Sequence, residues 1–129
     1  VHCALTSKNR HMLGAKQFKL MKPTAYLINT ARGPLVDEKA LYAALTRGGI
    51  AGAGLDVTEV EPINIDNPLL KLDNVVFTGH SAHYSDISVA YVRRKPIEDV
   101  YRIMSGKWPK GWVNPEVKAK FIARWGKTE

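Results

Sequence analysis

Three short apolar runs, spaced by helical or turn-rich segments, are the feature that most restricts the fold of this chain. They are residues 25–29 (AYLIN), 51–57 (AGAGLDV) and 74–78 (NVVFT). A strand buried on both faces gives a continuous apolar run, and strands that alternate with helices form parallel βαβ units. At 129 residues the chain is long enough for one such core. The sequence therefore predicts an α/β fold with a parallel sheet.

The segments around these runs are predicted to be helical. Residues 38–49 follow Asp37, a favoured N-cap, and end on two glycines. A shorter helix is predicted within residues 14–21, before a proline. A long helix is predicted from residue 85 to about residue 106, and Pro96 is expected to kink or interrupt it.

The two ends of the chain are expected to be extended. Residues 1–5 (VHCAL) have the composition of a strand, and residues 107–129 are expected to form an extended basic tail. The chain starts with Val1 and carries no charged, signal-like leader, so we expect it to be part of a longer protein. A single cysteine, Cys3, excludes an internal disulfide, and no apolar run reaches the roughly 18–20 residues of a membrane span. Both features predict a cytoplasmic protein.

The formal charge of +7 is concentrated in the tail. Residues 105–129 hold six Lys or Arg against two Glu, with three tryptophans nearby. A basic, aromatic segment can bind nucleic acid, but a charge run is more often a solvated surface. Nucleic-acid binding is therefore the last-ranked of the functions considered.

The glycines of residues 48–54 (GGIAGAG) resemble a nucleotide-binding loop but occur in the wrong order. A dinucleotide fingerprint follows a strand and opens a helix, whereas these glycines close a helix and open a strand. The chain therefore shows no phosphate-binding loop of its own.

Polar residues follow each predicted strand at the end where parallel sheets bind ligands. Thr30 and Arg32 follow the first run, and the second run ends at Asp56, with Glu61 shortly after. His80 follows the third run. A lone histidine in a loop is usually solvated, but a guanidinium, two carboxylates and an imidazole at successive strand ends predict a site.

The residue types indicate what this site would do. Arg32 offers a planar fork that matches a carboxylate, and His80 can exchange a proton near neutral pH. Glu61 could orient the imidazole, while Asp56 would accept from an amide or hydroxyl. This equipment suits the oxidation of a 2-hydroxy acid or the reduction of a 2-oxo acid, and a cofactor must carry the hydride.

Three segments together resemble the C-terminal half of the D-isomer-specific 2-hydroxyacid dehydrogenases: NTARGPLVDEKAL, GAGLDVTEVEP and FTGHSAHYSD. The likeness extends over residues 1–117. It implies the C-terminal half of a Rossmann-like NAD-binding domain, followed by a long helix and the tail. The implied division is residues 1–84 for the partial cofactor domain, 85–106 for the long helix and 107–129 for the tail.

The resemblance also implies a role for each site residue. Arg32 would hold the substrate carboxylate, and His80 would donate or accept the proton. Glu61, directly before a proline, would be the partner of His80, with Glu59 as a nearby competitor. The residues implied to contact the cofactor are Cys3, Asn9, Thr30, Ala31, Arg32, Asp56, His80 and His83. The cofactor would be NAD, with NADP as the alternative, because the residue that distinguishes them belongs to the other half of the domain.

Within the family, HCALTSKNRHML and HSAHYSD are most similar to the branch of the C-terminal-binding-protein corepressors. The implied alternative function is an NAD-sensing scaffold with little catalysis. The chain differs from that branch at His83, where a tryptophan is usual, and from the common TPH pattern at Gly79. An intact Arg32, Glu61 and His80 favours the enzyme.

Further expectations concern metal ions and partners. His80, His83 and Asp86 could be mistaken for a metal cluster, but loop spacing without a fourth ligand makes a metal site unexpected. Partners expected from the resemblance are a small 2-hydroxy or 2-oxo acid and a second copy of the protein, in a homodimer formed through the cofactor domain. The chain on its own is expected to be inactive.

Overall fold

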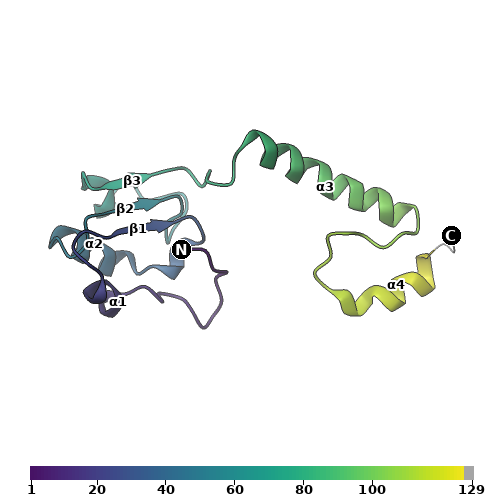
Figure 1. Ribbon diagram of the computed structural model, residues 1–129, viewed down its shortest axis with the longest axis horizontal. Coiled ribbons are helices and arrows are strands. Elements are labelled where there is room, and N and C mark those ends of the chain that lie inside the picture. Colours follow the sequence, from purple (N-terminus) through teal and green to yellow (C-terminus); the bar gives the residue numbers. More distant parts are fainter. Residues whose placement is uncertain (127–129) are drawn as a thin grey trace. The chain divides into compact units, whose positions relative to one another are not determined.

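The computed structural model describes residues 1–126 and divides into two compact units, Val1–Ala82 and His83–Glu129. The first unit contains the sheet, and the second contains the long helix (Figure 1).

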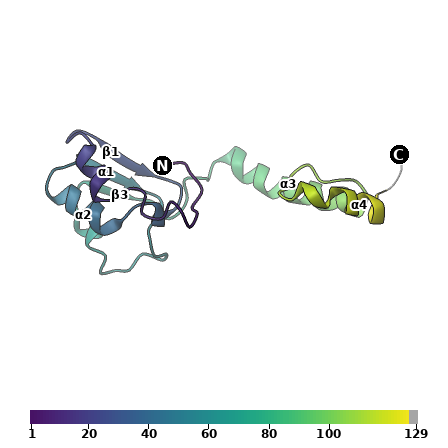
Figure 2. The same cartoon turned by 90° about the horizontal axis from the view of Figure 1, so that it is seen from below.

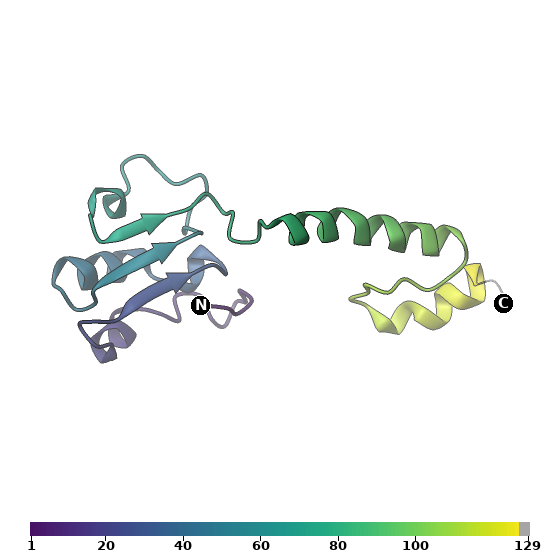
Figure 3. The same ribbon diagram turned by 45° about the horizontal axis from the view of Figure 1, so that its top comes forward.

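The first unit is built on a parallel sheet of three strands, which confirms the predicted α/β fold. The strands β1 (Tyr26–Asn29), β2 (Gly52–Leu55) and β3 (Val75–Phe77) lie in the order β1-β2-β3 (Figure 3). Both pairs are parallel, with Tyr26 opposite Gly52 and Ala53 opposite Val75. All three carboxyl ends therefore point to the same edge of the sheet.

Two helices cover one face of this sheet (Figures 1 and 2). They are α1 (Ala15–Leu20) and α2 (Glu38–Thr46), and the Asp37 side chain caps α2 by accepting the Ala40 N–H at 3.0 Å, as predicted. Two short 3₁₀ turns, Gly33–Leu35 and Pro68–Lys71, complete this side. The core between sheet and helices contains Phe18, Leu27, Val36, Leu41, Leu45, Ile50, Leu55 and Leu69.

The other face of the sheet is exposed in this unit. Along β1, Tyr26 and Ile28 are exposed, whereas Leu27 and Asn29 are buried. Val76 of β3 is also exposed. Apolar residues on both faces made the strands recognisable in the sequence, although only one face is covered here.

Residues 1–5, which are expected to be extended like a strand, form no regular secondary structure, so that prediction is wrong. The Val1 amino group donates to the Ile28 carbonyl oxygen at 2.5 Å, which brings this segment beside β1. A strand requires a ladder of such backbone hydrogen bonds, and one bond does not make a ladder.

In the second unit, α3 (Asp86–Met104) is the predicted long helix, capped by Ser85. The helix continues across Pro96, so the expected interruption is not observed. Proline removes the hydrogen bond to the carbonyl of Val92, but Val92 is exposed and water can bind that oxygen. Among residues 1–126, no helix is long and apolar enough to cross a membrane.

The tail is not extended throughout, which corrects the prediction. A 3₁₀ turn at Pro115–Val117 leads into α4 (Lys118–Trp125). Proline at the start of a helical turn costs no hydrogen bond. The Phe121 ring of α4 packs edge-on against Trp108, with ring centroids 5.4 Å apart, and this contact gives the helix a tertiary partner. Residues 127–129 lie outside the described chain.

Candidate active site

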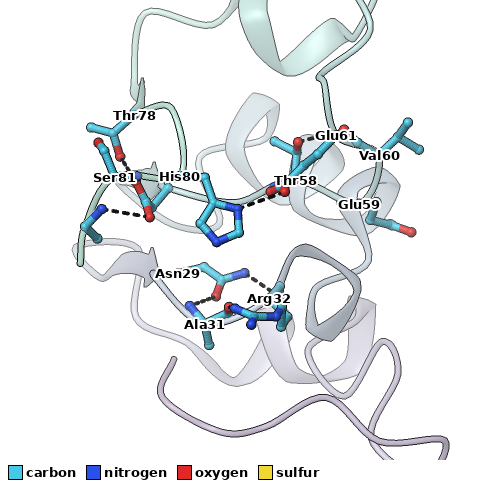
Figure 4. Close-up of polar contacts among 12 residues, drawn as sticks. Asn29, Ala31, Arg32, Thr58, Glu59, Val60, Glu61, Thr78, His80 and Ser81 are labelled. Carbon is cyan, nitrogen blue, oxygen red and sulfur yellow. Dashed lines mark hydrogen bonds and ion pairs between the residues drawn. The ribbon is translucent and has the colours of Figure 1, made fainter. Parts of the chain in front are cut away.

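The candidate site lies at the carboxyl edge of the sheet (Figure 4). The loop after β1 carries Arg32, the loop after β2 carries Asp56 and Glu61, and the loop after β3 carries His80. Because the three strands are parallel, loops that are far apart in sequence meet at this edge.

His80 and Glu61 form a hydrogen-bonded ion pair. Nδ1 of His80 lies 2.9 Å from Oε2 of Glu61. The second carboxylate oxygen, Oε1, accepts the backbone N–H of Thr58 at 3.1 Å, which fixes the rotamer of Glu61. Both side chains of the pair are half-exposed and so remain accessible to a small molecule.

The surroundings of Glu61 favour its ionised form. Partial burial opposes ionisation, but the hydrogen bond from His80 and the Thr58 amide outweigh it, together with the charges of His80 and Arg32. The pKa of Glu61 is therefore lowered below its ordinary value. A carboxylate facing Nδ1 favours the imidazole tautomer that carries a proton on that nitrogen.

His80 adopts an uncommon backbone conformation. Its φ of 55° lies in the left-handed region, where residues other than glycine are rare. The His80 N–H donates to the Asp56 carbonyl oxygen at 2.9 Å, and this bond holds the strained residue in place. Gly79, directly before it, has open space around its Cα.

Asp56 is buried, and both of its carboxylate oxygens accept hydrogen bonds from the loop that carries His80. Its Oδ1 accepts the Thr78 hydroxyl and the Ser81 N–H, the latter at 2.8 Å, and its Oδ2 accepts the Ala82 N–H at 3.0 Å. The Thr78 hydroxyl is the main cause of a lowered Asp56 pKa, and the Ala82 and Ser81 amides lower it further, against the opposing effect of burial. The sequence predicted that Asp56 would accept hydrogen bonds from amides and hydroxyls. It did not show that the protein's own Thr78, Ser81 and Ala82 donate them.

Asn29 and Gly33 position Arg32 from either side. The buried Asn29 side chain donates to the Arg32 carbonyl oxygen at 3.0 Å and accepts the Ala31 N–H at 3.1 Å. Gly33 lies directly against the Thr58 backbone, without space for a Cβ. The Arg32 guanidinium itself is exposed, and its Nη1 donates to the Ala31 carbonyl oxygen at 2.7 Å. An asparagine ending a buried strand was the signal that the sequence offered for this turn.

The other residues implied to contact the cofactor differ in their surroundings. Thr30 and Ala31 follow β1 directly and are half-buried. Asn9 closes its own loop by donating to the Ala4 carbonyl oxygen at 2.7 Å and accepting the Thr6 N–H at 2.7 Å. Cys3 is exposed, with its sulfur 3.7 Å from that of Met12.

His83 belongs to the second unit, where its ring packs against that of Tyr84, with centroids 4.3 Å apart and the planes tilted by 36°. No group of three His, Cys, Asp or Glu side chains that could hold a metal ion occurs within residues 1–126.

A cavity adjoins the His80–Glu61 pair. Its wall combines Asp56, Thr78 and the pair with the apolar side chains of Ile63, Leu70 and Phe77. Small-molecule sites typically pair apolar walls with a few convergent polar groups. Acid–base groups, an exposed guanidinium and an apolar wall at the strand ends fit a site for a nicotinamide and a small organic acid.

Comparisons with known proteins place the chain in a family. Residues 1–82 match the D-isomer specific 2-hydroxyacid dehydrogenase, NAD binding domain. Over 117 residues the chain is 48% identical to a glyoxylate reductase of Korarchaeum cryptofilum. This alignment covers 91% of this chain and 35% of the relative. The chain thus spans about a third of the length of this curated relative.

Two solved structures are similar in fold and sequence. One is a D-isomer specific 2-hydroxyacid dehydrogenase from Lactobacillus delbrueckii in its NAD-complexed form, with a TM-score of 0.76 and 39% identity over 88% of this chain and 38% of that one. The other is a D-isomer specific 2-hydroxyacid dehydrogenase from Xanthobacter autotrophicus in complex with NADPH. Its TM-score is 0.73, with 40% identity over 90% of this chain and 47% of that one. The chain therefore belongs to the D-isomer specific 2-hydroxyacid dehydrogenase family.

Proposed function

We propose that this chain supplies the acid–base half of an NAD-dependent oxidoreductase that interconverts a D-2-hydroxy acid and a 2-oxo acid. The observation that carries the proposal is the 2.9 Å pair of His80 and Glu61 at the sheet edge that also carries Arg32. The family and the reductase and dehydrogenase names of the relatives support catalysis over the NAD-sensing scaffold.

His80 would be the catalytic acid and base. With Nδ1 held by Glu61, Nε2 would donate a proton to the carbonyl oxygen of a 2-oxo acid and take it back in the reverse reaction. The hydrogen bond to Glu61 would hold the imidazole ring in one orientation. Figure 4 shows the imidazole of His80 between Glu61 and Arg32. A small substrate beside this ring could contact both the imidazole and the Arg32 guanidinium.

Arg32 would bind the substrate carboxylate. Its guanidinium is exposed, and the turn beneath it is fixed by Asn29. A planar fork can donate two parallel hydrogen bonds to a carboxylate, which fixes the orientation of the carbon beside it.

The nicotinamide cofactor, when bound, would supply or accept the hydride. Thr30, Ala31 and Asp56 would lie closest to it, with Cys3, Asn9, Arg32, His80 and His83 as the further contacts that the family resemblance implies. We propose NAD as the cofactor. The relatives of known structure include both an NAD-complexed and an NADPH-complexed protein, so NADP is the alternative.

The proposed activity belongs to a longer protein, because the chain spans 35% of the glyoxylate reductase that it matches. The chain alone would be inactive. We further propose a cytoplasmic homodimer formed through the cofactor domain, and the division of the chain into residues 1–84, 85–106 and 107–129 stays part of this proposal.

Steady-state oxidation of NADH with glyoxylate and other 2-oxo acids tests the proposal. In the complete protein, His80→Ala should lower kcat by on the order of 10²–10⁴-fold. NADH binding, followed by fluorescence, should weaken far less, because the other proposed cofactor contacts stay in place. The control is His2→Ala, which removes an exposed histidine that is not among the candidate site residues. Turnover that survives His80→Ala would refute the role of His80, and NADH binding without any turnover would favour the scaffold.

A further inference from the structure

A second polar cluster surrounds Glu59, which lies in the same loop as Glu61 and precedes it by two residues. Oε2 of Glu59 is 2.8 Å from Nε2 of His11 and 3.4 Å from Nη2 of Arg10. These partners come from a segment 48 and 49 residues away in sequence. The carboxylate of Glu59 therefore ties the Glu61 loop to the loop before α1.

Glu59 and Glu38 also exchange two hydrogen bonds. The Glu59 N–H donates to Oε1 of Glu38 at 2.6 Å, and the Glu38 N–H donates to Oε1 of Glu59 at 3.0 Å. Glu38 is the first residue of α2, and its other oxygen accepts the Asn67 side-chain amide at 2.8 Å. The backbone and the side chain of Glu59 are thus both attached to the start of a helix.

The exposed fractions distinguish the roles of the two glutamates. The Glu59 side chain is 19% exposed and uses both carboxylate oxygens within the protein, whereas Glu61 is 39% exposed and faces His80. A carboxylate that is mostly buried, hydrogen-bonded at both oxygens and paired with an arginine and a histidine holds a defined geometry. Glu59 is therefore unsuited to be the partner of His80 but well suited to hold the loop.

We propose that Glu59 is a positioning residue, which fixes the loop of residues 58–62 so that Glu61 stays within hydrogen-bond distance of His80. This inference rests on the proposed function in one respect, because the proposed function is what makes the Glu61–His80 pair catalytic. Only one residue separates the two glutamates. If Glu59 lost its hydrogen bonds and moved, Glu61 would move with it, away from His80.

The test is the pKa of the Glu61 carboxyl, measured by ¹³C NMR titration of the chain. Removing a neighbouring negative charge should by itself lower the pKa of Glu61 further, because like charges oppose ionisation. Loss of position should instead raise this pKa toward its ordinary value, because the His80 and Thr58 hydrogen bonds would weaken. The two explanations therefore predict opposite signs.

We expect Glu59→Ala to raise the pKa of Glu61 by on the order of half a unit or more. Glu59→Gln keeps an oxygen for the Glu38 N–H and should fold if the alanine variant does not, and it should give a smaller rise. Asp73→Asn, an exposed carboxylate before β3 at the opposite end of the sheet, should leave this pKa unchanged. An unchanged or lowered pKa of Glu61 in the folded Glu59 variants would overturn the proposal.

Kinetics of the complete protein separate this proposal from the proposed function. Glu59→Ala should lower kcat about tenfold without changing the KM for NADH, since the residue does not face the cofactor site. If the complete protein lacks dehydrogenase activity but the NMR result holds, the proposed function fails and the positioning role stands. If the enzyme is active and the pKa of Glu61 does not rise, only the positioning role fails.

Discussion

Asp56 accepts the backbone N–H of Ser81 at 2.8 Å, although the two residues are 25 positions apart in the sequence. The same carboxylate accepts the Ala82 N–H and the Thr78 hydroxyl, and the backbone of Asp56 accepts the His80 N–H. The end of β2 therefore anchors the loop after β3 on both sides of His80. The left-handed conformation of His80 is held by these bonds.

Asp56→Asn should loosen the loop that carries His80. An amide has one accepting oxygen, so at least one of the Ser81 and Ala82 N–H groups would lose its partner. Hydrogen exchange of that amide should accelerate by on the order of tenfold, measured by NMR. Thr78→Val, which removes the hydroxyl alone, serves as the comparison and should leave both amides protected. Equal protection in the wild type and in Asp56→Asn would contradict the anchoring role.

Gly33→Ala should destabilise the first unit. A Cβ at this position would overlap the Thr58 carbonyl group, and both sides of the contact are backbone. Overpacking of this kind costs roughly 1–3 kcal/mol, which a urea denaturation curve would resolve as a lower midpoint. Gly79→Ala is a matched control, because a Cβ there would meet nothing within 4 Å among the described residues. An unchanged midpoint for Gly33→Ala would show that the loop after β2 can move away from this turn.

Arg32→Lys should weaken substrate binding in the complete protein. Lysine keeps the positive charge but cannot donate two parallel hydrogen bonds to a carboxylate. The KM for a 2-oxo acid should rise on the order of 10- to 100-fold, with a smaller effect on kcat. Arg47→Lys, at the exposed end of α2, should change neither value. The same KM for Arg32→Lys and the wild type would exclude a bidentate contact.

Asp99 should make the second unit sensitive to acid. Its carboxylate accepts the Lys110 N–H at 2.6 Å and the Gly111 N–H at 2.9 Å, and these two amides lower the pKa of Asp99 below its ordinary value of 3.8. A lowered pKa in the folded state means that the contact stabilises the fold fully above pH 3.8 and is lost as the pH falls through the folded value.

The amide chemical shifts of Lys110 and Gly111, followed by NMR against pH, measure this directly. Their transition should have a midpoint below 3.8. Asp99→Asn should abolish the transition, because the asparagine side chain does not titrate in this range. A midpoint at or above 3.8 in the wild type would contradict the contact.

The sequence alone was sufficient for those parts of the fold and the site that follow from local pattern. Continuous apolar runs marked β1, β2 and β3, and Asp37 marked the start of α2, because burial and capping act within a few residues. The position of polar residues after successive strands was enough to expect Arg32, Asp56, Glu61 and His80 on one edge. The sequence failed to predict the conformation of residues 1–5 and the helix α4, where backbone hydrogen bonds and the Trp108–Phe121 contact decide the conformation.

The family resemblance predicted that Glu61 pairs with His80, but only the tertiary structure decided which groups Glu59 and Asp56 bind. The sequence places Glu59 and Glu61 two residues apart, and its pattern of residue types does not identify the partners of Glu59. The structure gives Glu61 to His80 and Glu59 to His11, because Glu38 at the start of α2 holds the loop from the other side. The same holds for Asp56, whose partners are the backbone amides of a loop after another strand. Such bonds depend on how the strands are placed side by side, and a linear pattern of residue types carries no record of that placement.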